Sequence, residues 1–141
     1  MSDAFRTLPV EAVKVGDELP ELEIPLTPTL IISTAIASRD YQDVHHDRDL
    51  ATQRGSKDIF MNILSTNGFV GRYVTDWAGP EAILHRVDIR LGVPNYPYDT
   101  MHLSGHVSEV SGPRVTVEIV GRNGLGNHVS GSVELVLPET G

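Results

Sequence analysis

Alternation of apolar and polar residues dominates the chain after residue 85 and limits its possible folds more than any other feature. Apolar residues recur at alternate positions in four segments, over residues 86–93, 101–108, 115–119 and 128–137. Successive side chains of a β-strand point to opposite faces, so each segment predicts a strand with one apolar face. Short turns such as residues 111–113 join the segments, which predicts an antiparallel sheet with one buried side.

Three histidines fall at polar positions of these segments. His102 and His106 share one strand face, where they could form a two-histidine metal site or lie on the solvent or subunit-interface side of the sheet. We favour the second interpretation. His128 is likewise expected to point away from the apolar face.

A single long helix is predicted before the strands. Asp58 is expected to cap it at its start, and Gly79-Pro80 is expected to end it. Its apolar residues recur at three- and four-residue spacings, as in a helix with one buried face. They are Ile59, Phe60, Ile63, Leu64, Val70, Val74 and Trp77.

The part of the chain before this helix is more mixed. Residues 1–18 have weak periodicity and predict an extended N-terminal arm, whereas residues 19–141 predict a single domain. Residues 19–26 predict a strand. Thr27 and Pro28 are typical of a helix start, with a hydroxyl cap followed by proline. A short helix is favoured there, although the β-branched residues that follow also suit a strand.

A long apolar helix and an antiparallel sheet with one apolar side can bury both surfaces if the sheet curls around the helix. This arrangement is the hot-dog fold, of the α+β class. A curved sheet of this size keeps an exposed edge strand, so pairing between two such domains is expected.

Composition excludes several classes of function. The formal net charge of −8, without a local cluster of Lys and Arg, argues against nucleic-acid binding. The absence of cysteine excludes disulfides, thiolate metal ligands and a cysteine nucleophile. The N-terminal sequence has no secretory pattern, and no stretch is apolar enough to span a bilayer. A cytoplasmic protein without membrane contact is therefore expected.

The most polar stretch, residues 40–57, precedes the long helix and holds the candidates for chemistry. A carboxylate at Asp40 and an imidazole at His45 could converge on one water molecule, remove a proton from it and hold the developing hydroxide. The residues alone leave two alternatives open. Asp40 could cap a turn beside solvated histidines, or His45, His46 and Asp47 could bind a metal ion.

The segment from Asp40 to His45 resembles the hydratase motif of the MaoC-like family of (R)-specific enoyl-CoA hydratases and dehydratases. That motif runs Asp, any residue, Asn, Pro, an aliphatic residue, His, and Asp47 matches the acidic residue often found two positions later. The likeness covers residues 19–137 and is greatest to one subgroup, the small MaoC-like subunits of actinobacterial hydratases that act on steroid (cholesterol) side chains. Four strings carry it: DVHHDRDLATQRGSKDIFMNIL, RYVTDWAGP, RLGVPNYPYDT and GRNGLGNHV.

The resemblance implies an enoyl-CoA hydratase, a hydro-lyase that adds water to a 2-enoyl-CoA. Asp40 would be the general base, and His45 would hold and polarise the same water. Burial against the helix is expected to raise the pKa of Asp40. The backbone amides of Asn62 and Ile63 would stabilise the negative charge that develops on the thioester oxygen.

Coenzyme A enters this reaction as part of the substrate, and the resemblance implies no separate cofactor and no metal. Arg122 and Asn123 are candidates for contacts with coenzyme A. Because the chain is acidic and coenzyme A is anionic, the site needs a local basic patch, which a partner could supply.

The implied substrate is a steroid enoyl-CoA with a three-carbon side chain, and the product is a 3-hydroxyacyl-CoA, a 17-hydroxy steroid CoA ester. The implied partner is a larger MaoC-like subunit with an appended DUF35 domain, assembled as a dimer of heterodimers. A thiolase-like aldolase is a further implied partner. Two alternatives are a non-catalytic hot-dog subunit that completes a partner's acyl-CoA tunnel and an acyl-CoA thioesterase. The thioesterase is disfavoured because residues 59–75 contain no Glu or Asp.

Two departures from the family pattern bear on the site. The Asn-Pro of the motif is Gln42-Asp43 here, which removes a rigid proline and adds a carboxylate. Many family members have His-Gly where this chain has Met61-Asn62. A backbone N–H does not depend on the side chain, so the oxyanion role can still be filled at this point.

Overall fold

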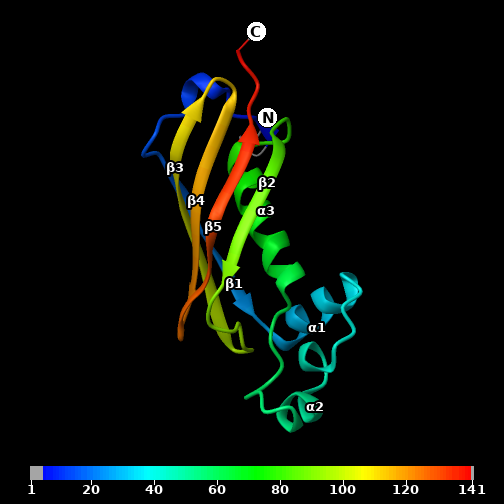
Figure 1. The fold of residues 1–141 in the computed structure, drawn as a ribbon. Coiled ribbons are helices and arrows are strands. Elements are labelled where there is room, and N and C mark those ends of the chain that lie inside the picture. The colour runs from blue at the N-terminus through cyan, green and yellow to red at the C-terminus, as the bar shows by residue number, and fades with distance from the viewer. Residues whose placement is uncertain (1–4, 141) are drawn as a thin grey trace.

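A five-stranded antiparallel sheet curls around one central helix, which confirms the predicted hot-dog arrangement (Figure 1). The structure is a computed structural model and describes residues 5–140; residues 1–4 of the expected arm and residue 141 of the expected domain lie outside the described residues. The strand order is β1-β3-β4-β5-β2. The strands are β1 (Glu18–Leu26), β2 (Ile83–Leu91), β3 (Asp99–Ser111), β4 (Arg114–Asn123) and β5 (Gly126–Val136).

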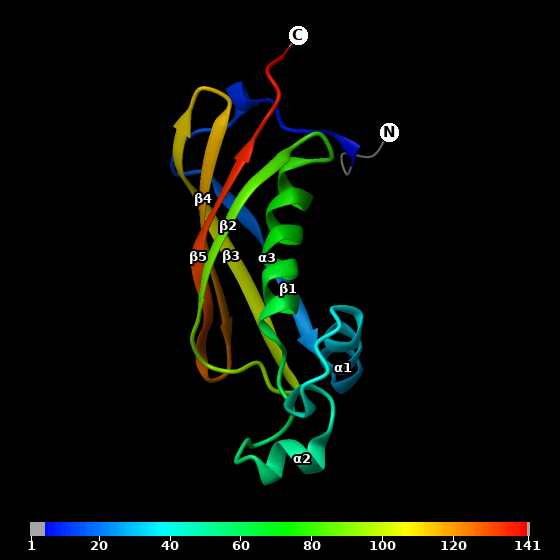
Figure 2. The same cartoon turned by 45° about the vertical axis from the view of Figure 1, so that its right-hand side comes forward.

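The core lies between the concave side of the sheet and helix α3 (Ile63–Ala78), as Figure 2 shows. Val70 and Val74 of α3 have no solvent exposure, and they belong to one cluster with the apolar residues of β3, β4 and β5. These strand residues are the ones whose alternation predicts the sheet. They are Met101, Leu103, Val107, Val115, Val117, Ile119, Val129, Val133 and Leu135.

Helix α3 begins four residues after the predicted start, so the assignment of Asp58 as its cap is wrong. Residues 59–62 lie outside any helix, and the N–H groups of Phe60 and Met61 donate to the carbonyls of Val44 and Asn95. Asn62 is the actual N-cap, and its side chain accepts from the N–H of Ser65 at 3.1 Å. An N-cap side chain accepts a hydrogen bond from a first-turn N–H that has no carbonyl partner within the helix, and the helix begins after it. Asn and Asp serve equally well in this role, so residue type alone does not distinguish Asp58 from Asn62.

The end of α3 matches the prediction. Gly79 follows Ala78 with a φ of 102°, in the left-handed region that favours glycine. The backbone of Arg6 and Thr7 occupies the space that a β-carbon at Gly79 would need. The N–H of Leu8 donates to the carbonyl of Ala78 at 2.8 Å, so the N-terminal segment lies against this end of the helix.

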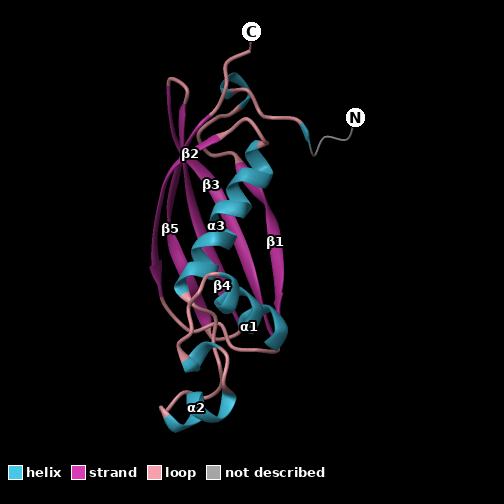
Figure 3. Ribbon diagram, turned by 90° about the vertical axis from the view of Figure 1, so that its right-hand side faces the viewer, coloured by secondary structure: helices cyan, strands magenta, loops and turns pink. Residues whose placement is uncertain are grey.

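The segment before α3 folds mostly as expected. Helix α1 (Pro28–Ala37) begins after Thr27, whose hydroxyl accepts from the N–H of Leu30 at 3.0 Å. The polar stretch contains a short 3-10 helix, η3 (Asp43–His45), and helix α2 (Arg48–Gln53). These three elements gather at the N-terminal end of α3 (Figure 3).

The N-terminal region is tied to the domain. The 3-10 helix η2 (Val10–Ala12) interrupts it, and Val10 and Val13 are buried in the core cluster. Val10 donates to the carbonyl of Pro138 at 2.9 Å. Within residues 5–140, no helix is long and apolar enough to cross a membrane.

His128 is buried, with 2% of its surface exposed, so the prediction that it faces away from the core is wrong. Its Nδ1–H donates to the carbonyl of Val93 at 2.7 Å, and its Nε2 accepts from the hydroxyl of Thr66 on α3 at 2.8 Å. Two polar partners make this burial tolerable. Burial lowers the pKa of His128 and keeps the ring neutral.

This burial predicts a pH dependence of stability. The unfolded chain gains a proton at His128 as the pH falls below about 6.5, whereas the folded chain gains it only at lower pH, so the free energy of unfolding should fall as the pH falls through this range. His128→Gln should be less stable at pH 7.5, by roughly 1–3 kcal/mol for the disturbed hydrogen bonds. Its stability should change less between pH 7.5 and pH 5.5 than that of the wild type.

Urea unfolding at several pH values measures both effects. His106→Gln, on the exposed face of β3, is the control and should follow the wild-type curve. Parallel pH curves for His128→Gln and the wild type would contradict the assignment.

Candidate functional site

Asp40, His45 and Asn62 meet at the N-terminal end of α3, where α1, η3 and α2 also gather (Figure 3). Asp40 lies three residues after the end of α1, and its N–H donates to the carbonyl of Ala35 at 3.0 Å. Arg39 before it has a φ of 58°, which is unusual for a residue other than glycine, and it turns the chain at this point. The fold therefore brings together the carboxylate and the imidazole that the sequence marks as candidates.

His45 is buried and held in one orientation. Its Nδ1 lies 2.7 Å from the carbonyl oxygen of Phe60, and the two aromatic rings are in edge contact, with centroids 4.9 Å apart. A carbonyl oxygen can only accept, so Nδ1 carries a proton. In the neutral ring, Nε2 then presents a lone pair, and it points toward Asp40 at a distance of 3.5 Å from Oδ2.

The gap between His45 and Asp40 suits a shared water molecule. A distance of 3.5 Å is longer than an ordinary N–H···O bond. Two acceptors, a carboxylate oxygen and a neutral imidazole nitrogen, cannot bond to each other directly, but the two O–H groups of one water can satisfy both. The geometry can therefore orient a water with its oxygen free to attack.

The pKa of Asp40 is lowered and not raised, so the expectation of a raised pKa is wrong. About 20% of its side chain is exposed. The hydrogen bond from Asn62 Nδ2 to Oδ2, at 3.0 Å, is the main influence and lowers the pKa of Asp40; the N–H of Gln42 and the nearby His45 and His46 act in the same direction. Partial burial opposes them and is outweighed.

The N-terminus of α3 offers amide donors beside these side chains. The first N–H groups of a helix have no partner within the helix, and the helix dipole favours negative charge there. Asn62 Oδ1 accepts a hydrogen bond from the N–H of Ser65. Within the described part of the chain, no acceptor is recorded for the amides of Asn62 and Ile63, the two candidates for an oxyanion site.

The first departure from the family motif is matched by an ion pair. Asp43, which stands where the family has proline, accepts from Arg54 Nε at 2.7 Å. The same residue begins η3, and its carbonyl accepts from the N–H groups of His46 and Asp47. The hydrogen bond from Arg54 lowers the pKa of Asp43. The ion pair between Asp43 and Arg54 thus restrains the turn at η3, where the family has the rigid ring of proline.

The alternative metal site at His45, His46 and Asp47 gains no support from the geometry. His46 Nε2 lies 3.1 Å from the carbonyl of Tyr41, and Asp47 caps α2 through the N–H of Leu50 at 3.0 Å. Each of the three side chains thus has a different partner. Among the described residues, the group of three acidic or histidine side chains whose ligand atoms lie within 4.8 Å of one another is Glu21, Glu23 and His102, on the outer face of the sheet.

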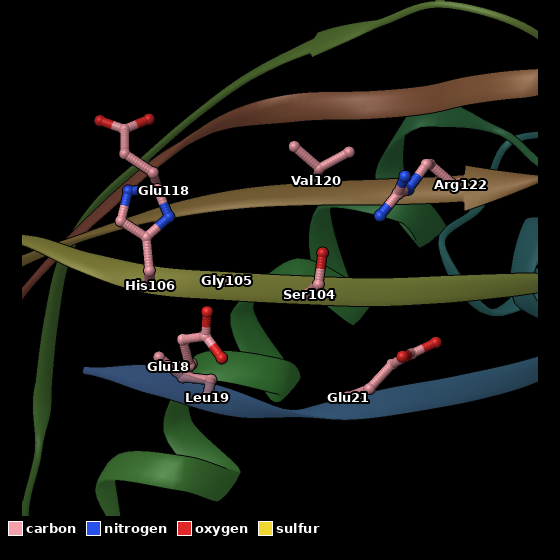
Figure 4. A pocket seen from close by; sticks show the side chains of 9 residues that line it. All are labelled: Glu18, Leu19, Glu21, Ser104, Gly105, His106, Glu118, Val120 and Arg122. Carbon is pink, nitrogen blue, oxygen red and sulfur yellow. The ribbon is translucent and has the colours of Figure 1, made fainter. Parts of the chain in front are cut away.

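Among the described residues, no contact is recorded between Asp40 and either Arg122 or Asn123. Arg122 lines an open concavity on the outer face of the sheet, with Glu21, Ser104 and His106 (Figure 4). Asn123 donates to the carbonyl of Pro94 and to Asn95 Oδ1, at 2.9 and 2.8 Å. Contacts of these two residues with coenzyme A stay predictions.

Sequence reasoning missed three contributors to the site: the hydroxyl of Ser38, the carbonyl of Phe60 and the side chain of Asn62. The carbonyl and the hydroxyl gave no sequence signal. Asn62 did, because asparagine is a favoured N-cap and precedes a helical apolar pattern.

A curled sheet around one central helix is the hot-dog fold, and in this chain an aspartate and a histidine meet at the N-terminal end of that helix. The chain is 56% identical to the 3-oxo-4,17-pregnadiene-20-carboxyl-CoA hydratase beta subunit of Mycobacterium tuberculosis over 126 residues, which are 89% of this chain and 98% of the relative. The chain therefore belongs to the MaoC-like enoyl-CoA hydratase family. No family model matches the sequence.

Two solved structures are similar in fold to this chain. A chain in the crystal structure of the ChsH1–ChsH2 complex from Mycobacterium tuberculosis is 57% identical, with a TM-score of 0.87, over 88% of this chain and 98% of that one. The unliganded R-hydratase PhaJ1 from Pseudomonas aeruginosa has a TM-score of 0.86 at 21% identity, over 95% of this chain and 88% of that one. The second likeness confirms the fold alone.

The Asp43–Arg54 ion pair leads to a prediction about the turn that carries His45. Arg54→Gln should loosen η3, because the charge-assisted contact is lost. The amides of His46 and Asp47 should then exchange with deuterium up to about fivefold faster, since exposed ion pairs contribute roughly 0.2–1 kcal/mol.

Hydrogen exchange read by NMR measures the rates. Arg72→Gln is the matched control, because it removes the exposed pair with Asp76 on α3 and should leave the same amides unchanged. Equal rates in Arg54→Gln and the wild type would show that the turn is held by other contacts.

Proposed function

We propose that this chain catalyses the addition of water to a 2-enoyl-CoA thioester. The observation that carries the proposal is the placement of Asp40 Oδ2 and His45 Nε2, 3.5 Å apart at the N-terminus of α3. Two acceptors around one water, beside unused helix amides, are what conjugate addition to a thioester needs.

In the proposed mechanism, Asp40 removes a proton from the water that it shares with His45. The water oxygen forms a bond to the β-carbon, and the electrons of the double bond move to the thioester oxygen as an enolate. The proton is then returned to the α-carbon, from Asp40 or through His45, so both groups end the cycle as they began. The low pKa of Asp40 keeps it ionised and able to accept the proton at neutral pH.

The enolate oxygen would lie against the amides of Asn62 and Ile63. Donors fixed before the reaction act without reorganisation, and loss of one oxyanion donor often costs roughly 3–4 kcal/mol. The helix dipole also stabilises the negative charge of the enolate, because the positive end of the dipole is at Asn62.

The acyl group is proposed to be a steroid with a three-carbon side chain, giving a 17-hydroxy steroid CoA ester in steroid degradation. The name of the 56% identical relative supports this substrate. An apolar groove of about 360 Å³ runs from Ser38 and Ser65, beside Asn62, to Arg72 along the seam of α1 and α3. From Leu64 to Arg72, the first and last residues of α3 that line the groove, the helix rises roughly 12 Å, a length that favours an extended fused-ring group over a short chain.

A larger MaoC-like subunit with a DUF35 domain is the proposed partner, in a dimer of heterodimers, and a thiolase-like aldolase is proposed to consume the product. The ChsH1–ChsH2 complex supports a heteromer. Strand β2 forms one edge of the sheet and exposes Ile83, Leu84 and Leu91. An apolar edge strand favours pairing with another chain.

The remaining proposals follow from this reaction. Hydration needs no cofactor other than the coenzyme A of the substrate, and the site is proposed to work without a metal. The acidic chain leaves a basic contribution to the CoA site to the partner. A cytoplasmic location is proposed, since acyl-CoA thioesters are intracellular metabolites.

Replacement of the base tests the proposal. Asp40→Asn keeps the shape of the side chain but cannot accept a proton, so kcat/KM for loss of the enoyl thioester absorbance should fall by roughly 10²- to 10⁴-fold. Asp47→Asn is the matched control: it removes the same charge from the same segment and can still cap α2, so its activity should stay at the wild-type level.

The same assay separates the rival functions. Free coenzyme A as product would indicate a thioesterase. Unchanged activity of Asp40→Asn in the assembled heteromer would indicate a non-catalytic subunit that completes its partner's tunnel.

The groove leads to a prediction about acyl size. A β-carbon at Gly68 would meet nothing within 4 Å, so Gly68→Leu should fold and fill the groove. For a steroid enoyl-CoA, kcat/KM should fall roughly tenfold or more, in line with the 1–3 kcal/mol typical of overpacking, while the four-carbon crotonyl-CoA should be unaffected.

Asn67→Leu, on the exposed side of α3 and outside the groove, is the control. Equal losses for both substrates would contradict the placement of the acyl group.

A further inference from the structure

The side chain of Asn62 is almost fully buried, with 1% of its surface exposed, and the proposed mechanism uses only its backbone. Its Nδ2 donates to Ser38 Oγ and to Asp40 Oδ2, both at 3.0 Å. Its Oδ1 accepts from the N–H of Ser65 at 3.1 Å and from the Ser65 hydroxyl. Both donors and both acceptor positions of the amide are therefore satisfied.

These contacts join three segments that are far apart in the sequence. Ser38 is the C-cap of α1, and its hydroxyl donates to the carbonyls of Thr34 and Ala35 at 2.8 and 3.0 Å. Asp40 lies in the loop that follows, and Ser65 is in the first turn of α3. The amide thus fixes the end of α1, the carboxylate and the start of α3 relative to one another.

Asp40 has few other restraints. Within residues 5–140, Oδ1 accepts from the N–H of Gln42 at 3.3 Å and has no other recorded donor, whereas Oδ2, which faces His45, accepts from Asn62. Without Asn62, the torsion of the carboxyl group would be free to turn Oδ2 away from His45 Nε2. A misplacement of about 1 Å can reduce a reaction rate roughly 10²-fold.

We propose that the side chain of Asn62 is a positioning residue that aims Asp40 at the water shared with His45, independently of its role as helix cap. The inference rests on the proposed function of Asp40 as the base. The two roles use opposite ends of the amide: Oδ1 caps the helix and Nδ2 holds the carboxylate.

The charged form of Asp40 is the one that this contact favours. An N–H donor stabilises a carboxylate more than a carboxylic acid, so the pKa of Asp40 should rise when the donor is removed. The other groups that face Asp40 are the N–H of Gln42 and the rings of His45 and His46, and each of them is retained in the variants below.

The separation of roles can be tested with a graded set of variants. Asn62→Ser keeps a helix-capping oxygen and removes the Nδ2 amide that donates to Asp40. Asn62→Asp keeps the shape and the cap but places a second carboxylate against Asp40. Asn62→Ala removes both functions, and Asn67→Ser on the exposed side of α3 is the control.

We expect kcat for a 2-enoyl-CoA to fall roughly ten- to a hundredfold in all three Asn62 variants, with KM changed less than about threefold. The acid limb of the kcat/KM profile should move to higher pH, most strongly in Asn62→Asp, where two carboxylates repel each other. Urea unfolding should rank Asn62→Ser above Asn62→Ala, because only the first retains a cap.

Two results would overturn the inference. One is Asn62→Ser with the wild-type kcat and pH profile. The other is a loss of activity that follows the loss of stability across the set. In an Asp40→Asn background, Asn62→Ser should cause no further loss, because a residue that acts through Asp40 has nothing left to position.

NMR titration of the Asp40 carboxyl separates this inference from the proposed function. If the wild type hydrates no enoyl-CoA, alone or with its partner, the proposed function fails. The titration still tests the contact, because the Asp40 pKa must be higher in Asn62→Ser than in the wild type. An unchanged pKa would overturn the inference even in a fully active enzyme.

Discussion

Burial of α3 against one apolar side of the sheet is the constraint on which the rest of the molecule depends. Val70, Val74 and Ala78 have no exposure, so the helix can neither rotate nor slide without opening the core. A fixed helix has a fixed N-terminus, and the amides of that end have a defined position. The loop that carries Asp40 and His45 is built against this end, through the Phe60 carbonyl and the Asn62 side chain.

Much of the architecture follows from the sequence, because it depends on periodicity. Alternation in the last three strands marks the buried faces correctly, and Thr27-Pro28 marks the start of α1. The errors fall where a single tertiary contact outweighs the local pattern. His128 sits at a polar position but finds Val93 and Thr66 as partners in the core. Likewise, the pairing of residues 60 and 61 with distant carbonyls delays the start of α3.

The candidate site was likewise only partly predictable from the sequence. A motif identifies Asp40 and His45, because the chemistry restricts residue type and spacing. The surroundings of these two residues depend on contacts between distant parts of the sequence. The pKa of Asp40, for example, is lowered by Asn62, which lies 22 residues away. Both departures from the family pattern acquire contacts in the structure. Asp43 pairs with Arg54, and Asn62 contacts Asp40, so two ordered contacts stand where the family has a proline and a glycine.

The attachment of the N-terminal segment to the C-terminal end of α3 has a practical consequence. Leu8 bonds to Ala78 and Val10 bonds to Pro138, so the described ends of the chain converge at one pole of the molecule (Figure 1). The polar loop lies at the opposite pole, separated by the 16 residues of α3, or roughly 24 Å. A surface tether, a fluorescent label or a tandem fusion joined at this pole would leave the polar loop free.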